Sequence, residues 1–596
     1  MPGMQHSAAS QSIKRVRTLF ALMVFVISVF VVRAFYLQVI QYGHYQKAAA
    51  ADQLVQEQIP ATRGLIEAES GNSIVPIVLN QTLYTVYVDP TLVKNVPKVA
   101  QTLSDELGGS VSSFESQLRT SGTRYVVLGE MVPASTESAI LSHKYPGVGA
   151  TANTYRTYPD GSLASQVLGF VNQSGQGEYG VEQALNKQLA GTPGELKAVT
   201  DINGVPLAAD SQNELKQPVA GQNVVLSIDV GMQEQMEQIL ASEYKATNSQ
   251  GLSAVIMDPN NGQIKAMANY PTYDPANYQD VTDPSLFQNA AVSNAIEPGS
   301  IMKTLTTSAA LNVGAIQPDS SFYDPAHWVV DGFNITDIEQ DGGAREQNIA
   351  SILALSLNTG AVWMLMQMSQ QGGTTISQKG INTWYNYMTN HFRLGEETGV
   401  EQGYESGGYV PTPDPTDPSI DLTYAETAFG QGVTVTALQM AAAISSVLNG
   451  GTYYKPTLVS EYINPTTGAT TQNKPVIEEK DVVSPKVGQE LIPLMENVVT
   501  TYLHEGFGFM SFSPDYMVGG KTGTAQVAQP GGGYYSSIFN GTYIGFVGGD
   551  TPQYVIVVFN TKPNVPGYAG SLGGQPVFAD LAHMLINNFG VTPKTQ

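Results

Sequence analysis

Residues 297–311, EPGSIMKTLTTSAAL, decide how the middle of this chain folds and what chemistry it can perform. Pro298 and Gly299 precede an apolar helical run, so Ser300 is predicted at or near a helix N-terminus. Residues i and i+3 share a helix face, which places Lys303 within hydrogen-bond reach of Ser300. Serine is a weak nucleophile that needs a neighbouring base, and a lysine in a dry, apolar setting has its pKa lowered enough to serve as one. About one S-x-x-K match is expected by chance in a chain of this length, so further motifs must support it.

Two later motifs supply matching groups. Ser356-Leu357-Asn358 precedes an apolar run. The Ser356 hydroxyl could pass a proton, and the Asn358 side-chain amide could bind a peptide-like substrate. Lys521-Thr522-Gly523-Thr524 has strand character, with a glycine where a ligand backbone could approach closely. A cation with two hydroxyls suits a substrate carboxylate. Taken singly, S-x-N is also what an ordinary helix cap looks like, and K-T-G could be a plain surface strand.

The order S-x-x-K, S-x-N, K-T-G is typical of penicillin-binding proteins and serine β-lactamases. The whole chain resembles a class B penicillin-binding protein, a D,D-transpeptidase of peptidoglycan synthesis. Other segments that carry the resemblance are Arg33-Ala34-Phe35-Tyr36-Leu37-Gln38-Val39, Arg63-Gly64-Leu65-Ile66, Tyr158-Pro159, Leu168-Gly169-Phe170-Val171, Gly180-Val181-Glu182, Asp258-Pro259, Ala266-Met267-Ala268, Phe429-Gly430-Gln431-Gly432 and Thr436-Ala437-Leu438-Gln439. One departure is visible: that family shows D-R-N-G-x-x-L-A after Ile66, where this chain has Glu67-Ala68-Glu69-Ser70-Gly71-Asn72.

The resemblance implies a role for each motif residue. Ser300 would attack the carbonyl between two D-alanines of a stem peptide, Lys303 would take its proton, and Ser356 would relay that proton to the departing D-Ala. Asn358 would hold the substrate amide. The terminal carboxylate would be bound or oriented by the third motif (Lys521, Thr522, Gly523, Thr524), and backbone N–H groups of Ser300 and Thr524 would form the oxyanion hole. A β-lactam would acylate Ser300 because its strained amide mimics the substrate. No metal and no cofactor is implied.

Composition excludes several other classes. Lys plus Arg number 28 against 51 Asp plus Glu, a net charge of −23, which argues against a nucleic-acid partner because phosphate binding needs a basic face. The chain has no cysteine, so disulfides, thiolate zinc sites and a cysteine nucleophile are excluded. The seven histidines lie far apart, and none shows H-x-x-x-H metal spacing.

A membrane anchor is predicted near the N-terminus. Residues 18–40 are mostly apolar, and a helix of this length measures about 35 Å, enough to cross a bilayer. Lys14, Arg15 and Arg17 precede it, which favours a cytoplasmic N-terminus and an extracytoplasmic remainder. A cleaved signal peptide is the alternative, but no small-residue cleavage site directly follows the apolar core. We therefore expect a single-pass protein of the cell membrane.

The expected fold is α+β. Residues 1–17 form a cytoplasmic tail, 18–40 the transmembrane helix, 41–215 an extended mixed pedestal (dimerisation-type) domain, 216–590 the transpeptidase domain, and 591–596 a tail. Residues 252–257 and 263–268 predict one β-hairpin, and residues 543–547 and 554–559 a second. Strands at both ends of this region with helical runs between them indicate a central antiparallel sheet flanked by helices.

Alternatives from other classes remain. A D,D-carboxypeptidase or a β-lactamase-like hydrolase would use water in place of the acceptor amine, and a catalytically silent scaffold of the wall-synthesis complex would bind no penicillin. A bifunctional glycosyltransferase needs a further domain, for which residues 41–215 leave no room. Expected partners are D-Ala-D-Ala stem peptides, β-lactams, the membrane, and, by resemblance, a membrane-embedded glycan polymerase and other divisome or elongasome proteins. Chain length and the compact region before Ser300 favour a role in septation over elongation.

Overall fold

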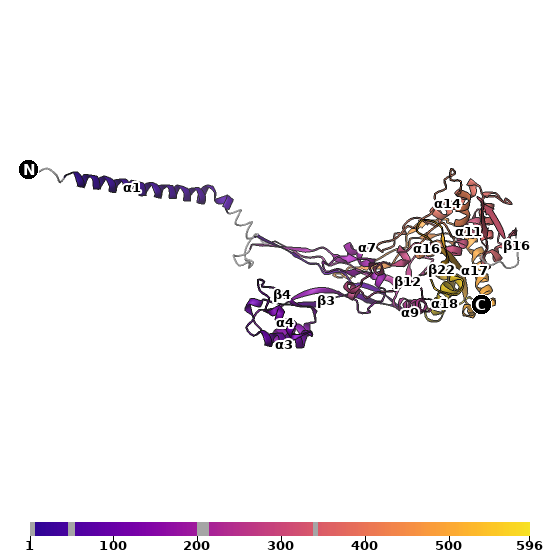
Figure 1. Ribbon diagram of the computed structural model, residues 1–596, viewed down its shortest axis with the longest axis horizontal. Helices are drawn as coiled ribbons and strands as arrows, with labels where there is room; N and C mark the ends of the chain where they lie inside the picture. The colour runs from indigo at the N-terminus through magenta and orange to yellow at the C-terminus, as the bar shows by residue number, and fades with distance from the viewer. Residues whose placement is uncertain (1–5, 46–53, 200–213, 338–343, 596) are drawn as a thin grey trace, which may run out of the picture. The chain divides into compact units, whose positions relative to one another are not determined.

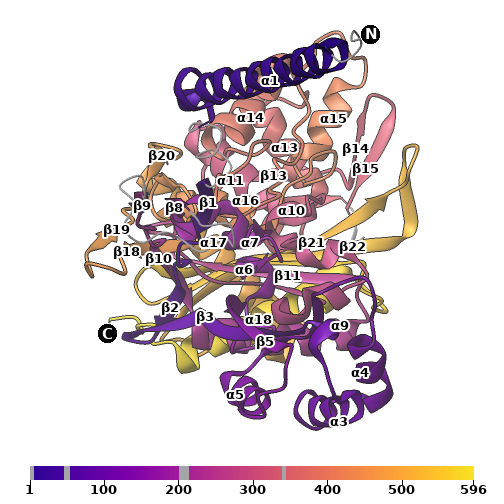
Figure 2. The same ribbon diagram turned by 90° about the vertical axis from the view of Figure 1, so that its left-hand side faces the viewer.

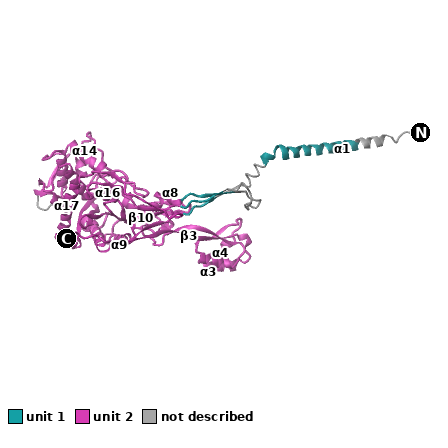
Figure 3. Ribbon diagram, turned by 180° about the vertical axis from the view of Figure 1, so that it is seen from behind, with its two compact units in different colours: residues 1–62, 191–220 teal, residues 63–190, 221–596 magenta. Residues whose placement is uncertain are grey.

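The structure is a computed structural model that describes residues 6–45, 54–199, 214–337 and 344–595. Residues 1–5 of the predicted tail and Gln596 lie outside the described residues. Internal contacts divide the chain into two units (Figure 3). The first comprises residues 1–62 and 191–220, and the second comprises residues 63–190 and 221–596.

The first unit contains the apolar helix predicted for residues 18–40. Helix α1 (His6–Phe35) continues directly into a π-helical turn (Tyr36–Ile40). The segment Arg15–Ile40 has 26 residues and a mean hydropathy of 2.4, and none of its hydrophobic window is buried. Its length of about 39 Å suffices to cross a bilayer. The described residues of this unit also form a three-stranded antiparallel sheet, in the order β1 (Leu54–Ile59), β8 (Gly194–Val199), β9 (Glu214–Lys216).

The second unit is built on a five-stranded antiparallel sheet, of which β12 and β22 are labelled in Figure 1. Its strand order is β12 (Ile264–Tyr270), β11 (Gly251–Met257), β23 (Pro552–Thr561), β22 (Tyr534–Gly548) and β21 (Met517–Ala528). The apolar residues of β23 from Val555 to Val558 are fully buried because both faces of the sheet are covered. Both predicted hairpins are confirmed, as β11–β12 and β22–β23.

Helices cover both faces of this sheet. Figure 2 shows α11 (Met302–Asn312) and α16 (Ala437–Leu448) on one side of strands β11 and β21, and α9 (Val230–Thr247) and α18 (Gln575–Asn588) on the other. The predicted central antiparallel sheet flanked by helices is confirmed. Further elements on the α11 side are α10 (Ala290–Ser293), α12 (Ile349–Ala354), α13 (Asn358–Ser369), α14 (Gln378–Asn386), α15 (Ile420–Thr427), α17 (Pro485–His504), and the short strands β13 (Ser321–Asp324), β14 (His327–Val330), β15 (Phe333–Thr336) and β16 (Arg345–Asn348).

A second sheet joins distant parts of the chain. Its order is β19 (Thr470–Gln472), β18 (Val459–Ile463), β10 (Asn223–Asp229), β2 (Ile66–Ser70), β3 (Ser73–Val88), β4 (Val126–Val132), and β5 (Val148–Thr157) also pairs with β3. Strand β10 runs parallel to β2 and antiparallel to β18. Residues predicted for the pedestal and for the transpeptidase domain thus share one sheet. A separate small core lies under β3 and includes residues of α3 (Val96–Leu107) and α4 (Val111–Leu118).

A buried carboxylate ties the pedestal segments of this unit together. Glu182 is fully buried and accepts hydrogen bonds from Arg63 Nε at 2.8 Å and from Arg156 Nε at 2.7 Å. A buried charge is tolerated when it is both paired and hydrogen-bonded. Two of the segments that carried the family resemblance, the one at Arg63 and the one at Glu182, therefore meet in a single structural contact.

Candidate active site

Ser300 lies where a tight turn enters a buried helix. Residues Gly299–Ile301 form a 3₁₀ turn, and α11 begins at Met302. Gly299 has φ +62, and a Cβ at this position would lie 2.7 Å from the carbonyl oxygen of Thr524. Only glycine allows both this backbone conformation and this close approach. The Pro-Gly pair therefore places Ser300 directly before α11, near the helix N-terminus that the sequence predicts, and allows this turn to pack closely on strand β21.

Lys303 lies at the centre of the predicted constellation. Its Nζ lies 2.9 Å from Ser300 Oγ, 2.5 Å from the carbonyl oxygen of Ser356, 3.3 Å from Ser356 Oγ and 2.8 Å from Asn358 Oδ1. The Lys303 side chain is fully buried. The first two motifs are therefore brought together within hydrogen-bonding distance of one amine.

The S-x-N motif connects two helices, α12 and α13. Ser356 has φ +60, an uncommon conformation for a residue with a side chain and one that clusters at functional sites. Asn358 begins α13, and its Nδ2 donates to the carbonyl oxygen of Thr336 while its Oδ1 accepts from Lys303. The amide of Asn358 is thus held at both ends by the protein itself.

The third motif lies on β21, as predicted from its strand character. Lys521 is fully buried, and its Nζ donates to the carbonyl oxygen of Thr522 at 3.0 Å and to Thr522 Oγ1 at 3.4 Å. The hydroxyl of Thr522 also pairs with Tyr502 Oη at 2.6 Å. Thr524 Oγ1 accepts from the backbone N–H of Gly570 at 3.0 Å.

Gly523 permits a close approach by the chain's own backbone. A Cβ at this position would lie 2.6 Å from the carbonyl oxygen of Pro298, which precedes the nucleophile turn. The glycine therefore lets β21 pack directly on that turn, and this is what joins the third motif to the first. A direct contact between Gly523 and a substrate stays a prediction.

The electrostatic setting of Lys303 favours its neutral form. Burial lowers the pKa of Lys303 well below its ordinary value, and the positive charge of Lys521 lowers it further. The carboxylate of Asp337 acts in the opposite direction. Asp337 accepts from the backbone N–H of Thr359 at 3.0 Å and from Thr359 Oγ1 at 2.9 Å, and burial raises its own pKa. Our sequence reasoning missed Asp337, because it belongs to no motif and follows a strand that comes close to the site only in the folded chain.

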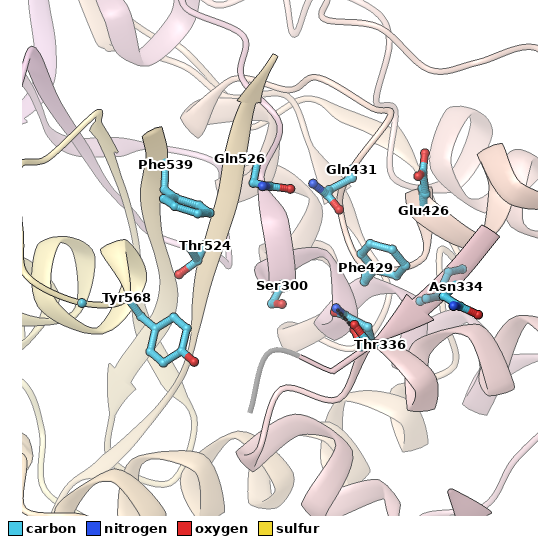
Figure 4. A pocket seen from close by; sticks show the side chains of 13 residues that line it. Ser300, Asn334, Thr336, Glu426, Phe429, Gln431, Thr524, Gln526, Phe539 and Tyr568 are labelled. Carbon is cyan, nitrogen blue, oxygen red and sulfur yellow. Dashed lines mark hydrogen bonds between the residues drawn. The ribbon is translucent and has the colours of Figure 1, made fainter. Parts of the chain in front are cut away.

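A cavity of about 510 Å³ opens at Ser300 (Figure 4). Three of the predicted residues line it: Ser300, Asn358 and Thr524. Lys303, Ser356, Lys521, Thr522 and Gly523 are not on its wall. The other lining residues are Asn334, Ile335, Thr336, Glu426, Phe429, Gln431, Gln526, Phe539, Gly567 and Tyr568. The sequence analysis noted the segment at Phe429 to Gly432 but gave it no role, and Glu426 carried no signal.

We expect Asp337→Asn to shift the acid limb of the pH–rate profile for acylation to lower pH. A base works only when it is deprotonated, so with Lys303 as the predicted base we expect acylation to fall as the pH falls through the pKa of Lys303. Asp337 raises that pKa, and the asparagine removes its charge while keeping an acceptor for the Thr359 N–H. Rates of penicillin acylation measured across a pH series test this. Asp580 is another partly buried carboxylate with a raised pKa, and Asp580→Asn should leave the acid limb at its wild-type pH. An unchanged or upward-shifted limb in Asp337→Asn would contradict the electrostatic role.

Comparison with known protein families gives two matches. The penicillin-binding protein transpeptidase domain matches residues 252–583, and the penicillin-binding protein dimerisation domain matches residues 58–226. Stage V sporulation protein D of Bacillus subtilis is 31% identical over 524 residues, which cover 87% of this chain and 78% of that protein. Peptidoglycan D,D-transpeptidase FtsI of Escherichia coli is 25% identical over 571 residues, which cover 94% of this chain and 89% of that protein.

Solved structures show the same architecture. Penicillin-binding protein 2X from Streptococcus thermophilus superposes with a TM-score of 0.72 at 23% identity, covering 90% of this chain and 80% of that one. Penicillin-binding protein 3 from Mycobacterium tuberculosis, complexed with aztreonam, superposes with a TM-score of 0.67 at 25% identity, covering 90% of this chain and 98% of that one. The fold predicted from the sequence is therefore confirmed by neighbours of known structure.

Proposed function

The chain belongs to the penicillin-binding proteins of the transpeptidase family, and from this we propose that it is a peptidoglycan D,D-transpeptidase with Ser300 as its nucleophile. In this reaction a serine acyl-enzyme forms on a stem peptide with release of D-alanine, and the acyl group passes to an amine of a neighbouring stem. β-Lactams acylate the same serine.

One observation carries the assignment of roles: the distance of 2.9 Å between Lys303 Nζ and Ser300 Oγ in a fully buried setting. A neutral lysine amine has two hydrogens and one lone pair. The backbone carbonyl oxygen of Ser356 and the side-chain amide oxygen of Asn358 can only accept hydrogen bonds, so they accept the two hydrogens of the amine. The lone pair then faces the Ser300 hydroxyl, which is the arrangement a general base requires.

This geometry, together with the family resemblance, supports the following proposed steps. Lys303 takes the proton of Ser300 as its oxygen attacks the carbonyl between the two D-alanines. Ser356, whose Oγ lies 3.3 Å from Lys303 Nζ, relays that proton to the departing D-Ala. Backbone N–H groups of Ser300 and Thr524 stabilise the developing oxyanion, and one such donor is typically worth ~2.7–4 kcal/mol of barrier. Asn358, on the cavity wall, orients the substrate amide.

Lys521 and its neighbours provide the carboxylate end of the site. Thr524 lines the cavity directly, while Lys521 is buried, is not on the cavity wall, and supplies positive charge. Thr522 holds the Lys521 amine through its backbone carbonyl and its hydroxyl. In this arrangement Lys521 acts on the carboxylate mainly through its field, and Gly523 and Thr524 present the strand edge.

We further propose that α1 anchors a single-pass membrane protein with a cytoplasmic N-terminus and an extracytoplasmic catalytic domain. The basic residues before the apolar run support this orientation. In this proposal the pedestal spans 41–215, the transpeptidase domain 216–590, and residues 1–17 and 591–596 are tails. The partner is a membrane-embedded glycan polymerase, together with other divisome or elongasome proteins, contacted through the anchor and pedestal.

The reaction product distinguishes this function from the alternatives. The purified full-length protein is incubated with a D-Ala-D-Ala stem peptide and an acceptor amine, and the products are separated by mass. A transpeptidase gives the amide of the acceptor. A product that is only the free acid would show a carboxypeptidase or β-lactamase-like hydrolase. Failure to bind any penicillin would show a catalytically silent scaffold.

We expect Lys521→Ala to slow acylation by penicillin about tenfold to a hundredfold, the range for loss of one charge-assisted interaction. The loss should be larger for the acid than for an uncharged ester. A penicillin methyl ester, which has no negative charge at this position, should lose less in Lys521→Ala than the acid does, because the ester responds only to the effect of Lys521 on the pKa of Lys303. Stopped-flow acylation with the acid and the ester measures both. Equal losses for acid and ester would contradict the carboxylate role of Lys521.

A further inference from the structure

The cavity at Ser300 has two chemically different sides (Figure 4). Thr524 and Tyr568 lie on one side of Ser300, and Phe429, Gln431 and Glu426 lie on the other. Thr524 on the first side belongs to β21, which in the proposed function receives the terminal carboxylate of the donor stem. The opposite side comes from α15 and the loop that follows it, and the formation of the acyl-enzyme leaves it without a role.

That opposite side is acidic. Glu426 is the one Asp, Glu, Lys or Arg among the described residues that line the cavity. A second carboxylate, Glu297, lies close by: its Oε1 accepts from the backbone N–H of Gly432 at 2.9 Å and from Tyr534 Oη at 2.8 Å. The other oxygen of Glu297 is buried and has no hydrogen-bond partner within the described part of the chain. Burial raises the pKa of Glu426, and the charge of Glu297 raises it further.

The second half of the reaction brings a cation to this site. A lysine side-chain amine has a pKa of about 10.4 and an α-amine beside an amide one of about 8, so near neutral pH the acceptor arrives mainly as an ammonium. A carboxylate on a partly desolvated wall attracts an ammonium and repels another carboxylate. Where the amine-bearing carbon of the acceptor also carries a free carboxylate, that group enters beside the amine and is repelled by Glu426 on the cavity wall and by the nearby charge of Glu297, which does not line the cavity.

We propose that Glu426 binds the ammonium of the acceptor stem and selects acceptors whose amine-bearing carbon has no free carboxylate. Such acceptors are the side-chain amine of a lysine-like residue and a diamino acid whose adjacent carboxyl group is amidated. The inference rests on the proposed function, because it concerns the acceptor of the same acyl group.

The transfer itself is balanced without Glu426 changing its charge. The amine nitrogen forms a bond to the acyl carbon, and the bond from that carbon to Ser300 Oγ breaks. Of the two protons that the ammonium loses, one passes to water and the other to Ser300 Oγ. Because a carboxylate stabilises the ammonium and not the attacking amine, Glu426 contributes to acceptor binding and its effect falls on the KM of the acceptor.

The test compares two small acceptors that differ only at the carboxyl group, glycinamide and glycine. The full-length protein is acylated with a thioester donor, and the ratio of amide product to hydrolysis product is measured over a range of acceptor concentrations. The wild type should favour glycinamide. In Glu426→Gln the KM for glycinamide should rise and the preference over glycine should fall about fivefold, the effect of one partly exposed charge pair. Glu426→Lys should reverse the preference toward glycine.

Comparing variants at one pH cancels the intrinsic difference in reactivity between the two amines. Glu243→Gln serves as a matched control, because Glu243 is also partly buried with a raised pKa but does not line the cavity, and it should keep the wild-type preference. An unchanged preference in both Glu426 variants, with normal acylation by penicillin, would overturn this inference alone. Absence of acylation in the wild type would instead overturn the proposed function.

Discussion

Replacing Ser300 with alanine is expected to abolish covalent labelling by a fluorescent penicillin. Acylation forms a bond to the serine oxygen, so removal of that oxygen removes the reaction and does not merely slow it. Within the described part of the chain, Ser300 is the one hydroxyl that both lines the cavity and lies 2.9 Å from the buried amine of Lys303. Labelled protein is detected by fluorescence after denaturing electrophoresis, which retains only covalent adducts.

Ser308→Ala is the matched control for this experiment. Ser308 lies on the same helix, is also fully buried, and its hydroxyl donates to the carbonyl oxygen of Thr304 at 2.6 Å. It should label like the wild type, and thermal unfolding should show that both variants fold. Labelling of Ser300→Ala at the wild-type level would rule out Ser300 as the nucleophile.

Replacing Lys303 with arginine is expected to lower the acylation rate by about 10²–10⁴-fold, the usual contribution of a positioned general base. A guanidinium carries a permanent positive charge and cannot be deprotonated, so it cannot accept the proton of Ser300. The burial and the neighbouring Lys521 that favour the neutral amine of Lys303 cannot lower the pKa of the guanidinium far enough to free a base. Stopped-flow acylation by penicillin measures the loss.

Lys265→Arg controls for the substitution itself. Lys265 is partly buried and forms an ion pair with Glu69 at 2.9 Å, away from the cavity. This variant should acylate at the wild-type rate. An Lys303→Arg protein that folds and reacts as fast as the wild type would show that another group is the base.

Much of the fold follows from local signals in the sequence. The hairpins β11–β12 and β22–β23 were predicted because apolar strands flank short turns, and α1 was predicted because a long apolar run has few other stable forms. The strands that pair with β10 were not predicted. Its apolar residues 224–226 indicate a buried strand, but nothing local shows that it runs parallel to β2, more than 150 residues earlier. Pairing across such separations depends on the packing of the whole unit.

The candidate site also contains some contacts that local sequence patterns predict and others that they do not. The Ser300 to Lys303 contact follows from helix geometry, because three residues return the chain to the same face. The meeting of Lys303 with Ser356 and Asn358 followed only from the order of the motifs and the family resemblance. Asp337 and Glu426 were missed because neither belongs to a motif: Asp337 directly follows β15, and Glu426 lies on α15. A single carboxylate has no sequence signal until the fold places it beside a lysine or in a cavity.

The most direct test of the central claim is the location of the penicillin adduct. The full-length protein is treated with penicillin and digested, and the adduct is mapped by mass spectrometry. The proposed chemistry predicts one penicilloyl group, on the peptide that contains Ser300 and bonded to that residue. An adduct on Ser356 or on any other residue, or no adduct on a folded protein, would contradict it.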